Sequence, residues 1–281
     1  MMKGKQRTVA IIVLAVVFVI CGALMLRQAV DYRNAEQSNA QALELAKLPS
    51  EPKELPDVLT PLAPPKVTVS ATEPPAEAVP EAKPLDKAAK YLAYLDIQPL
   101  QQVNSDVIGW IYIPDTVVNY PLLYAGNNAT YLSTAWNGTE NRAGSIFLEA
   151  KNQLDFADFN TIIYGHHMRN GSMFADIINY REQAFRDTHP YIYISTGSTI
   201  RKYEVFSAYE AGITTDTYRL YFKDDTQKQS AISHYQTSSV LSQAQIPTVD
   251  DYILTLSTCT GNGTYETRWV VQAILIAQWE H

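Results

Sequence analysis

An uninterrupted apolar run near the N-terminus limits what the rest of this chain can form. Val9–Leu26 is eighteen residues long, uncharged and mostly apolar. As an α-helix it would extend roughly 27 Å, about the thickness of the hydrocarbon layer of a bilayer. Basic residues precede the run, and the charges that follow it are mixed. The positive-inside rule therefore predicts a cytoplasmic tail at residues 1–7, a transmembrane signal anchor at 8–27, and the rest of the chain outside the cell.

A cleaved signal peptide would show the same order of charges. The apolar run is long for a signal peptide, however, and no small-x-small cleavage pattern follows it. Cys21 is preceded by Ile20, whereas a lipoprotein site requires a small residue there. We therefore expect an uncleaved anchor in which Cys21 is an inert apolar residue.

The segment that follows is poor in the side chains that build a core. Asp31–Lys47 is rich in Ala, Gln, Glu and Leu and favours a short helix. Ten of the fifteen prolines then lie in Pro49–Pro84, which contains no aromatic residue. Such a segment buries too little apolar surface to fold, and proline biases it toward extended polyproline II. Residues 28–84 are therefore predicted to form an extracellular stalk, Pro-rich from 49, with a reach on the order of 100 Å.

Composition places one globular domain in residues 85–281. This part holds all four tryptophans and seventeen of the eighteen tyrosines. The net charge of the whole chain is −7, which argues against a general nucleic-acid partner. Two cysteines exclude a fold built on disulfides, and the five histidines lack zinc-site spacing, so we expect no metal and no cofactor.

The sequence of this domain predicts a mainly β fold. About eight short runs rich in β-branched and aromatic residues lack a regular alternation with helices, which favours a closed or nearly closed β-barrel. Helices are predicted at Leu85–Val103, Met173–Ile178 and around Thr226–Leu241. The predicted strands are Val107–Pro114, Val117–Leu123, Gly144–Leu148, Asn160–Gly165, Tyr191–Ser195, Ile200–Tyr209, Tyr252–Thr258 and Arg268–Ala277.

Cys259 ends one of these strands and is followed by a polar, glycine-containing loop. A free thiol outside the cell is a liability unless it is used, although a buried core cysteine would explain it equally well. A thiol nucleophile needs a proton-handling partner and a donor for the oxyanion. His166, at another strand end, is the candidate for the first role. Arg268 is the candidate for the second, since a hairpin would bring it beside Cys259.

Three separate motifs resemble the sortases. Thr255–Cys259 (TLSTC) followed by Arg268 resembles the sortase signature T-L-x-T-C…R. Ile162–Met168 (IIYGHHM), with the GSMF at 171–174, is similar to the histidine segment of class B sortases. Asn141–Leu148 (NRAGSIFL) resembles a class B stretch upstream of that histidine. The resemblance spans roughly residues 88–278, and the membrane anchor also suits a family found on the outer face of Gram-positive cells.

The resemblance implies an eight-stranded sortase-type β-barrel with N-terminal helices and a helix before the cysteine strand. It implies transpeptidation: the Cys259 thiol cleaves a C-terminal sorting motif of a secreted protein after Thr, with an Asn-Pro-x-Thr type favoured. An amine of a peptidoglycan precursor or of a pilin would then resolve the thioester. In this scheme His166 moves the protons and Arg268 orients the substrate.

The resemblance also suggests substrate contacts. Ser257 lies two residues before Cys259, on the same strand face by alternation, and is similar to a substrate-contacting serine of class B enzymes. Asn128 and Leu132 are matched to substrate-groove residues. Between Cys259 and Arg268 the chain carries only one acidic residue, Glu266, where class B loops are often more acidic. Two alternatives are a thiol hydrolase or protease on the same barrel and a non-catalytic cell-wall or pilus binding module.

Overall fold

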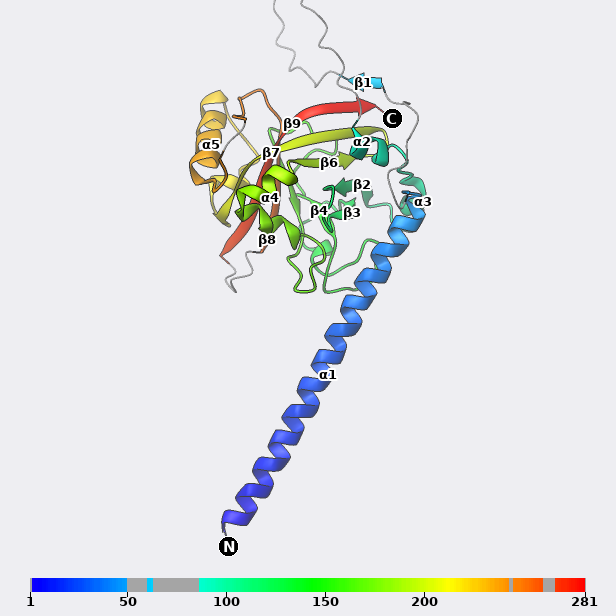
Figure 1. Cartoon of the computed structure of the whole chain (residues 1–281), viewed down its shortest axis with the longest axis vertical. Coiled ribbons are helices and arrows are strands. Elements are labelled where there is room, and N and C mark those ends of the chain that lie inside the picture. Colours follow the sequence, from blue (N-terminus) through cyan, green and yellow to red (C-terminus); the bar gives the residue numbers. More distant parts are fainter. Residues whose placement is uncertain (1, 50–59, 63–85, 243–244, 260–265, 281) are drawn as a thin grey trace, which may run out of the picture.

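A computed structural model describes residues 2–49, 60–62, 86–242, 245–259 and 266–280 (Figure 1). Eight strands form a closed ring in the order β9-β7-β6-β2-β3-β4-β5-β8, and β8 pairs with β9 to complete it. The barrel predicted from the strand pattern is therefore confirmed. The strands are β2 Val107–Tyr112, β3 Asn119–Leu123, β4 Ile146–Leu148, β5 Asn160–Tyr164, β6 Tyr191–Ser195, β7 Thr199–Gly212, β8 Ile253–Cys259 and β9 Thr267–Glu280.

Most neighbouring strands are antiparallel, but β3 and β4 are parallel, and so are β5 and β8. The main hydrophobic cluster fills the barrel with side chains from opposite strands, among them Ile111, Ile163, Leu254 and Val271. All four are at most 1% exposed. Strands that are apolar on the inner face stay in register because a slip of one residue would turn that face to solvent.

Short helices cover the outside of the barrel. The single helix expected at 85–103 is two helices, α2 Lys87–Leu92 and α3 Gln98–Val103. Asp86 caps α2 by accepting a hydrogen bond from the amide of Ala89 at 3.0 Å. Between the two helices, the Asp96 carboxylate accepts a hydrogen bond from the amide of Gln98, the first residue of α3.

The helix before the cysteine strand is present as α5 Asp225–Ser238, capped by the carboxylate of Asp224. It packs on the barrel through Ile232 and Tyr235, which are fully buried. The helix expected at Met173–Ile178 is a 3-10 helix displaced to Asp176–Arg181. The remaining short helices are α4 Gln183–Thr188 and the 3-10 turns Thr130–Leu132 and Asp216–Tyr218.

The N-terminal segment is one helix, α1 Met2–Leu45, that joins the apolar run to the helix-forming stretch after it. The described part of its apolar region is long and apolar enough to cross a membrane and makes no buried contact. The last turns of α1 lie against the domain, whereas its N-terminal half extends away from it (Figure 1).

In the parts of the predicted stalk, residues 28–84, that the structure describes, the chain contacts the barrel domain. Ala42 of α1 and Ala46, directly after the helix, are fully buried against the domain. Farther along the chain, β1 Thr60–Leu62 pairs antiparallel with Gln278–Glu280 at the end of β9. Alanine is small enough for close helix packing, and a backbone with free hydrogen-bonding groups can extend a sheet edge even where prolines are frequent. The rest of the Pro-rich segment lies outside the described residues.

Candidate active site

The register of three strands brings the distant motifs together. Cys259 is the last residue of β8, and its Cα partner on β9 is Arg268. On the other side of β8, Ser257 is paired with Tyr164 of β5. Because β5 and β8 are parallel, both chains leave the sheet at the same edge, and His166 follows β5 there. The carbonyl of Ser257 accepts a hydrogen bond from the amide of Gly165 at 3.2 Å, which fixes this exit.

Five of the six predicted site residues line one hollow of about 380 Å³. The sixth, Cys259, is described by its backbone, which lies at the end of the strand that borders the hollow. The five are Asn128, Leu132, His166, Ser257 and Arg268; the other lining residues are Phe147, Tyr164, Gly165, Ile213, Tyr218 and Thr258. The polar loop at 260–265, which the sequence placed after the cysteine, lies outside the described residues.

The imidazole of His166 is held by the backbone of the 3-10 turn Thr130–Leu132. Its Nε2 lies 2.8 Å from the carbonyl oxygen of Leu132. A carbonyl oxygen can only accept, so Nε2 carries the proton and Nδ1 is the nitrogen able to take another one. Leu132 was expected to contact substrate, and its carbonyl has a further function in orienting the histidine.

Two glycines allow His166 and the carbonyl of Leu132 to come this close. A Cβ on Gly165 would lie 2.5 Å from Cδ1 of Ile146 and 2.7 Å from Cδ2 of Phe174, so only glycine fits before the histidine. Gly144 has a φ of +59°, and a Cβ there would overlap the carbonyl oxygen of Tyr131 and lie 2.9 Å from that of Leu132. The glycine of the NRAGSIFL motif thus leaves room for the carbonyl that binds His166.

Arg268 is half-buried at the start of β9, and its guanidinium donates to the carbonyl of Thr267 at 2.9 Å. Ser257 is 2% exposed, and its hydroxyl lies 2.9 Å from the hydroxyl of Tyr218. Tyr218 comes from the 3-10 turn after β7 and was missed by the sequence reasoning. It is one of eighteen tyrosines, and no motif surrounds it.

A buried carboxylate supports the other wall of the hollow. Glu149 is 6% exposed and accepts hydrogen bonds from Asn128 Nδ2 at 2.7 Å and from the Tyr164 hydroxyl at 2.9 Å. Burial raises the pKa of Tyr164, and the charge of Glu149 raises it further, so this phenol remains a neutral donor. The side-chain oxygen of Asn128 accepts from the amide of Ala150. Asn128 therefore links its loop to the segment directly after β4, a function that the sequence did not reveal.

His167 is placed apart from this hollow. It lines a second hollow beside α1, together with Arg142 and Arg169. The side chains of the adjacent residues His166 and His167 thus line two different hollows. Among the residues that the structure describes, no group of three or more His, Cys, Asp or Glu side chains is arranged to hold a metal ion.

Comparison with known proteins agrees with this geometry. The family model "Sortase domain" matches residues 111–276. Sortase B of Listeria monocytogenes is 37% identical over 186 residues, covering 65% of this chain and 75% of that protein. A Staphylococcus aureus sortase B–substrate complex superimposes with a TM-score of 0.61 at 33% identity, covering 64% of this chain and 84% of that one.

A Bacillus anthracis sortase B in complex with AAEK1 matches over a longer stretch. It covers 88% of this chain and 99% of that one, with a TM-score of 0.66 at 29% identity. The strand order, the matched domain and these relatives lead to one conclusion: the chain belongs to the sortase family and is a class B, sortase-type cysteine transpeptidase.

Proposed function

We propose that this transpeptidase works through Cys259 as nucleophile, His166 as the group that moves protons and Arg268 as the group that binds the substrate carbonyl. The observation that carries the proposal is the β8–β9 register, which pairs the backbones of Cys259 and Arg268 at the edge where β5 delivers His166. These three residues come from separate parts of the sequence and have no shared structural need to meet. Participation in one reaction would explain why these three residues lie together.

In the first half of the reaction, the Cys259 thiolate adds to the carbonyl carbon of the Thr in a sorting motif. The negative charge that develops on the carbonyl oxygen is stabilised by the guanidinium of Arg268, whose planar, charged fork suits an oxyanion. The C–N bond after Thr then breaks, and the protonated His166 gives its proton to the leaving amine. The products are a thioester on Cys259 and the freed C-terminal fragment.

In the second half, an acceptor amine attacks the thioester carbonyl. His166 takes a proton from this amine, the C–S bond breaks, and a new amide bond joins the secreted protein to the acceptor. The acceptor is an amine of a peptidoglycan precursor or of a pilin, and the sorting motif is of the Asn-Pro-x-Thr type. The substrate backbone lies in the hollow between Ser257 and the Asn128–Leu132 segment.

The location follows from the N-terminal helix. Val9–Leu26 crosses the membrane, the basic N-terminus is cytoplasmic, and the barrel is extracellular. The exposed apolar side chains of this stretch, 49% exposed at Val17 and 80% at Phe18, support contact with lipid.

The test is intact-protein mass spectrometry of the full chain in detergent, mixed with a small set of Asn-Pro-x-Thr peptides. We expect an adduct with the mass of the peptide through Thr, and its release by an added amine as the amide product. The Cys259→Ala variant should form no adduct. The matched control Cys21→Ala, which removes an exposed thiol on α1, should react as the unmodified protein does.

Three results would contradict the proposal. An adduct that forms normally in Cys259→Ala would place the nucleophile elsewhere. A thioester that is released by water at the same rate with and without amine would indicate a hydrolase on the same barrel. Cleavage of no peptide in the set, with no adduct, would favour a barrel that binds without catalysing.

A further inference from the structure

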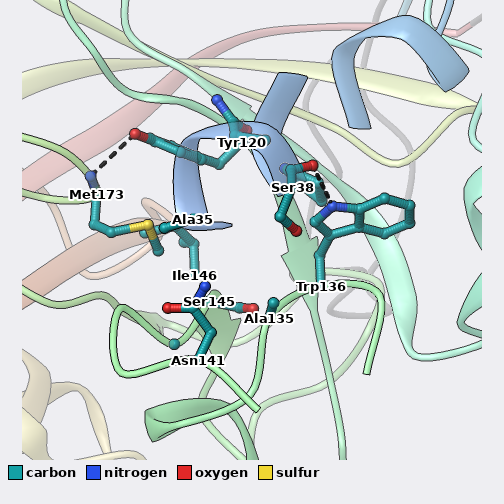
Figure 2. Close-up of a pocket in the computed structure, with 12 residues that line it drawn as sticks. Ala35, Ser38, Tyr120, Ala135, Trp136, Asn141, Ser145, Ile146 and Met173 are labelled. Carbon is teal, nitrogen blue, oxygen red and sulfur yellow. Dashed lines mark hydrogen bonds between the residues drawn. The ribbon is translucent and has the colours of Figure 1, made fainter. Parts of the chain in front are cut away.

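The extramembrane part of α1 is built into the barrel domain rather than linked to it. The side chains of this helix that are at least half-buried recur every three or four residues, which is one face of a helix. In the part of the helix beyond the apolar stretch they are Asp31, Tyr32, Ala35, Ser38, Asn39, Ala42, Leu43 and Leu45, and Ala46 directly after the helix is fully buried. Figure 2 shows Ala35 and Ser38 facing Tyr120 and Trp136 of the domain, around a cavity of only about 30 Å³.

Directional bonds fix this docking. The indole Nε1 of Trp136 donates to the carbonyl oxygen of Ser38 at 2.7 Å (Figure 2). At the end of the helix, the amide of Asp96 donates to the carbonyl of Ala46 at 3.1 Å. The ammonium of Lys47 lies 2.8 Å from the carboxylate of Asp96. Since α1 is unbroken from Met2 to Leu45, the orientation of the domain is coupled to that of the membrane-crossing stretch.

The docked face begins almost where the apolar stretch ends. The hollow beside α1 is lined on the helix side by Gln28, Asp31 and Tyr32, only two to six residues after Leu26. At about 1.5 Å per residue these positions are about 3 to 9 Å beyond the hydrocarbon boundary. A headgroup layer is about 5 to 8 Å thick. The domain residues across the hollow therefore lie at the height of the lipid headgroups.

Those domain residues are basic. Arg142 and Arg169 are exposed and line the hollow of about 400 Å³ with His167 and Met168. The next hollow along α1 brings Asn170–Ser172 against the helix near Arg33. Acidic groups in the same region are Asp31 and Glu36, both on the helix itself. The side of the domain that meets the headgroups thus offers guanidinium forks, which bind phosphate oxygens in bidentate fashion.

We propose that Arg142 and the loop His167–Ser172 form a membrane-apposed surface that contacts the phosphates of anionic phospholipids, and that docked α1 holds it there. This proposal rests on the membrane anchorage proposed above. Because the loop begins directly after His166, the active site is held at a fixed, short height above the bilayer. Substrates then reach it only if their reactive group also lies close to the membrane, as in a sorting motif just outside a membrane-embedded tail or a lipid-linked amine.

The test measures height above the membrane in the full chain, reconstituted in phosphatidylglycerol vesicles that carry a headgroup-attached quencher. With Cys21 and Cys259 replaced by Ala, a fluorophore is attached to Asn170→Cys or to Ser198→Cys. Ser198 is an exposed residue on the turn before β7. The next residue, Thr199, begins β7 and pairs with Glu280 of β9. This end of β7 and β9 lies at the end of the molecule opposite the N-terminus (Figure 1). We expect strong quenching at 170 and little at 198.

Two further comparisons separate helix docking from headgroup charge. Ala42→Glu places a carboxylate in a fully buried contact and should abolish the excess quenching at 170. The control Gln41→Glu adds the same charge on the exposed face of α1 and should leave the excess unchanged. The pair Arg142→Gln and Arg169→Gln, or vesicles of phosphatidylcholine alone, should lower the quenching at 170.

Each result decides a definite point. Equal quenching at 170 and 198 in chains that float with the vesicles would overturn the proposal while leaving the anchor in place. Chains that do not float would overturn the anchorage and this proposal together, whereas the peptide-adduct assay would still report transpeptidation. Excess quenching that survives removal of both arginines would refute the role of the phosphates.

Discussion

A substitution at Gly144 tests whether the carbonyl of Leu132 orients His166. Alanine at this position would keep a φ of +59°, a conformation that costs a non-glycine residue about 1–2 kcal/mol. Its Cβ would also overlap the carbonyl oxygen of Tyr131 and lie 2.9 Å from that of Leu132. Overpacking against a backbone that cannot swing aside costs about 1–3 kcal/mol more. The expected loss of unfolding free energy is therefore about 2–5 kcal/mol.

Gly126 provides the matched control. Its φ is +68°, but a Cβ there meets no atom within 4 Å. Gly126→Ala should therefore lose only the conformational part, about 1–2 kcal/mol. For a domain of this size, the additional loss in Gly144→Ala corresponds to a Tm lower by about 2–12 °C. Thermal unfolding of both full-length variants in detergent, followed by near-UV circular dichroism, measures the difference.

Activity gives the second readout. If the Tyr131 and Leu132 carbonyls move to accommodate the new methyl group, the 2.8 Å contact to His166 Nε2 is lost. A misplacement of about 1 Å of a catalytic group reduces kcat by up to about 100-fold. We expect kcat to fall at least about tenfold in Gly144→Ala and to stay near the unmodified value in Gly126→Ala. Equal Tm values together with equal kcat values in the two variants would refute the reasoning.

Three other variants make separate predictions. Arg268→Lys keeps the charge but loses the planar fork, so the variant should fold normally while kcat falls by at least about tenfold; unchanged kcat would argue against oxyanion binding. Tyr218→Phe removes the partner of the Ser257 hydroxyl, so KM should rise more than kcat falls, and adding Ser257→Ala should have little further effect if the two act as a pair. Burial alone would raise the pKa of Asp86, but hydrogen bonds from Lys202 and Tyr193 outweigh it and lower the pKa below its ordinary value of 3.8. The charged form therefore stabilises the fold above that pH, and the contribution disappears as the pH falls through the lowered pKa; urea unfolding of Asp86→Asn should show a smaller loss of stability in this acid range than the unmodified chain.

The strands could be predicted because their apolar and aromatic residues recur in short runs that suit a pleated, half-buried surface. Ile162–Tyr164 and Ile253–Leu256 carry this signal in the sequence and are buried in the structure, apart from the half-buried Tyr164. The candidate catalytic residues could be proposed because each lies in a local motif. The register that brings them together is a property of the whole barrel, and only the fold supplies it.

What the sequence missed depends on contacts between distant residues. Tyr218 meets Ser257 across 39 residues of chain, and Glu149, the residue directly after the NRAGSIFL motif, meets Asn128 and Tyr164. The docking of α1 was missed for a related reason. Its buried face consists largely of alanine and polar residues, which in isolation indicate a solvated helix.

The pairing of β1 with β9 and the docking of α1 bear on how this protein responds to proteases. In a chain whose domain is tethered by a stalk, one cut in the stalk sheds the domain from the cell. Here a cut between Leu62 and Asp86 leaves α1 packed on the domain and β1 paired with Gln278–Glu280. We therefore expect the two fragments to remain associated after such a cut and, with the membrane anchor proposed above, the domain to stay attached to the membrane.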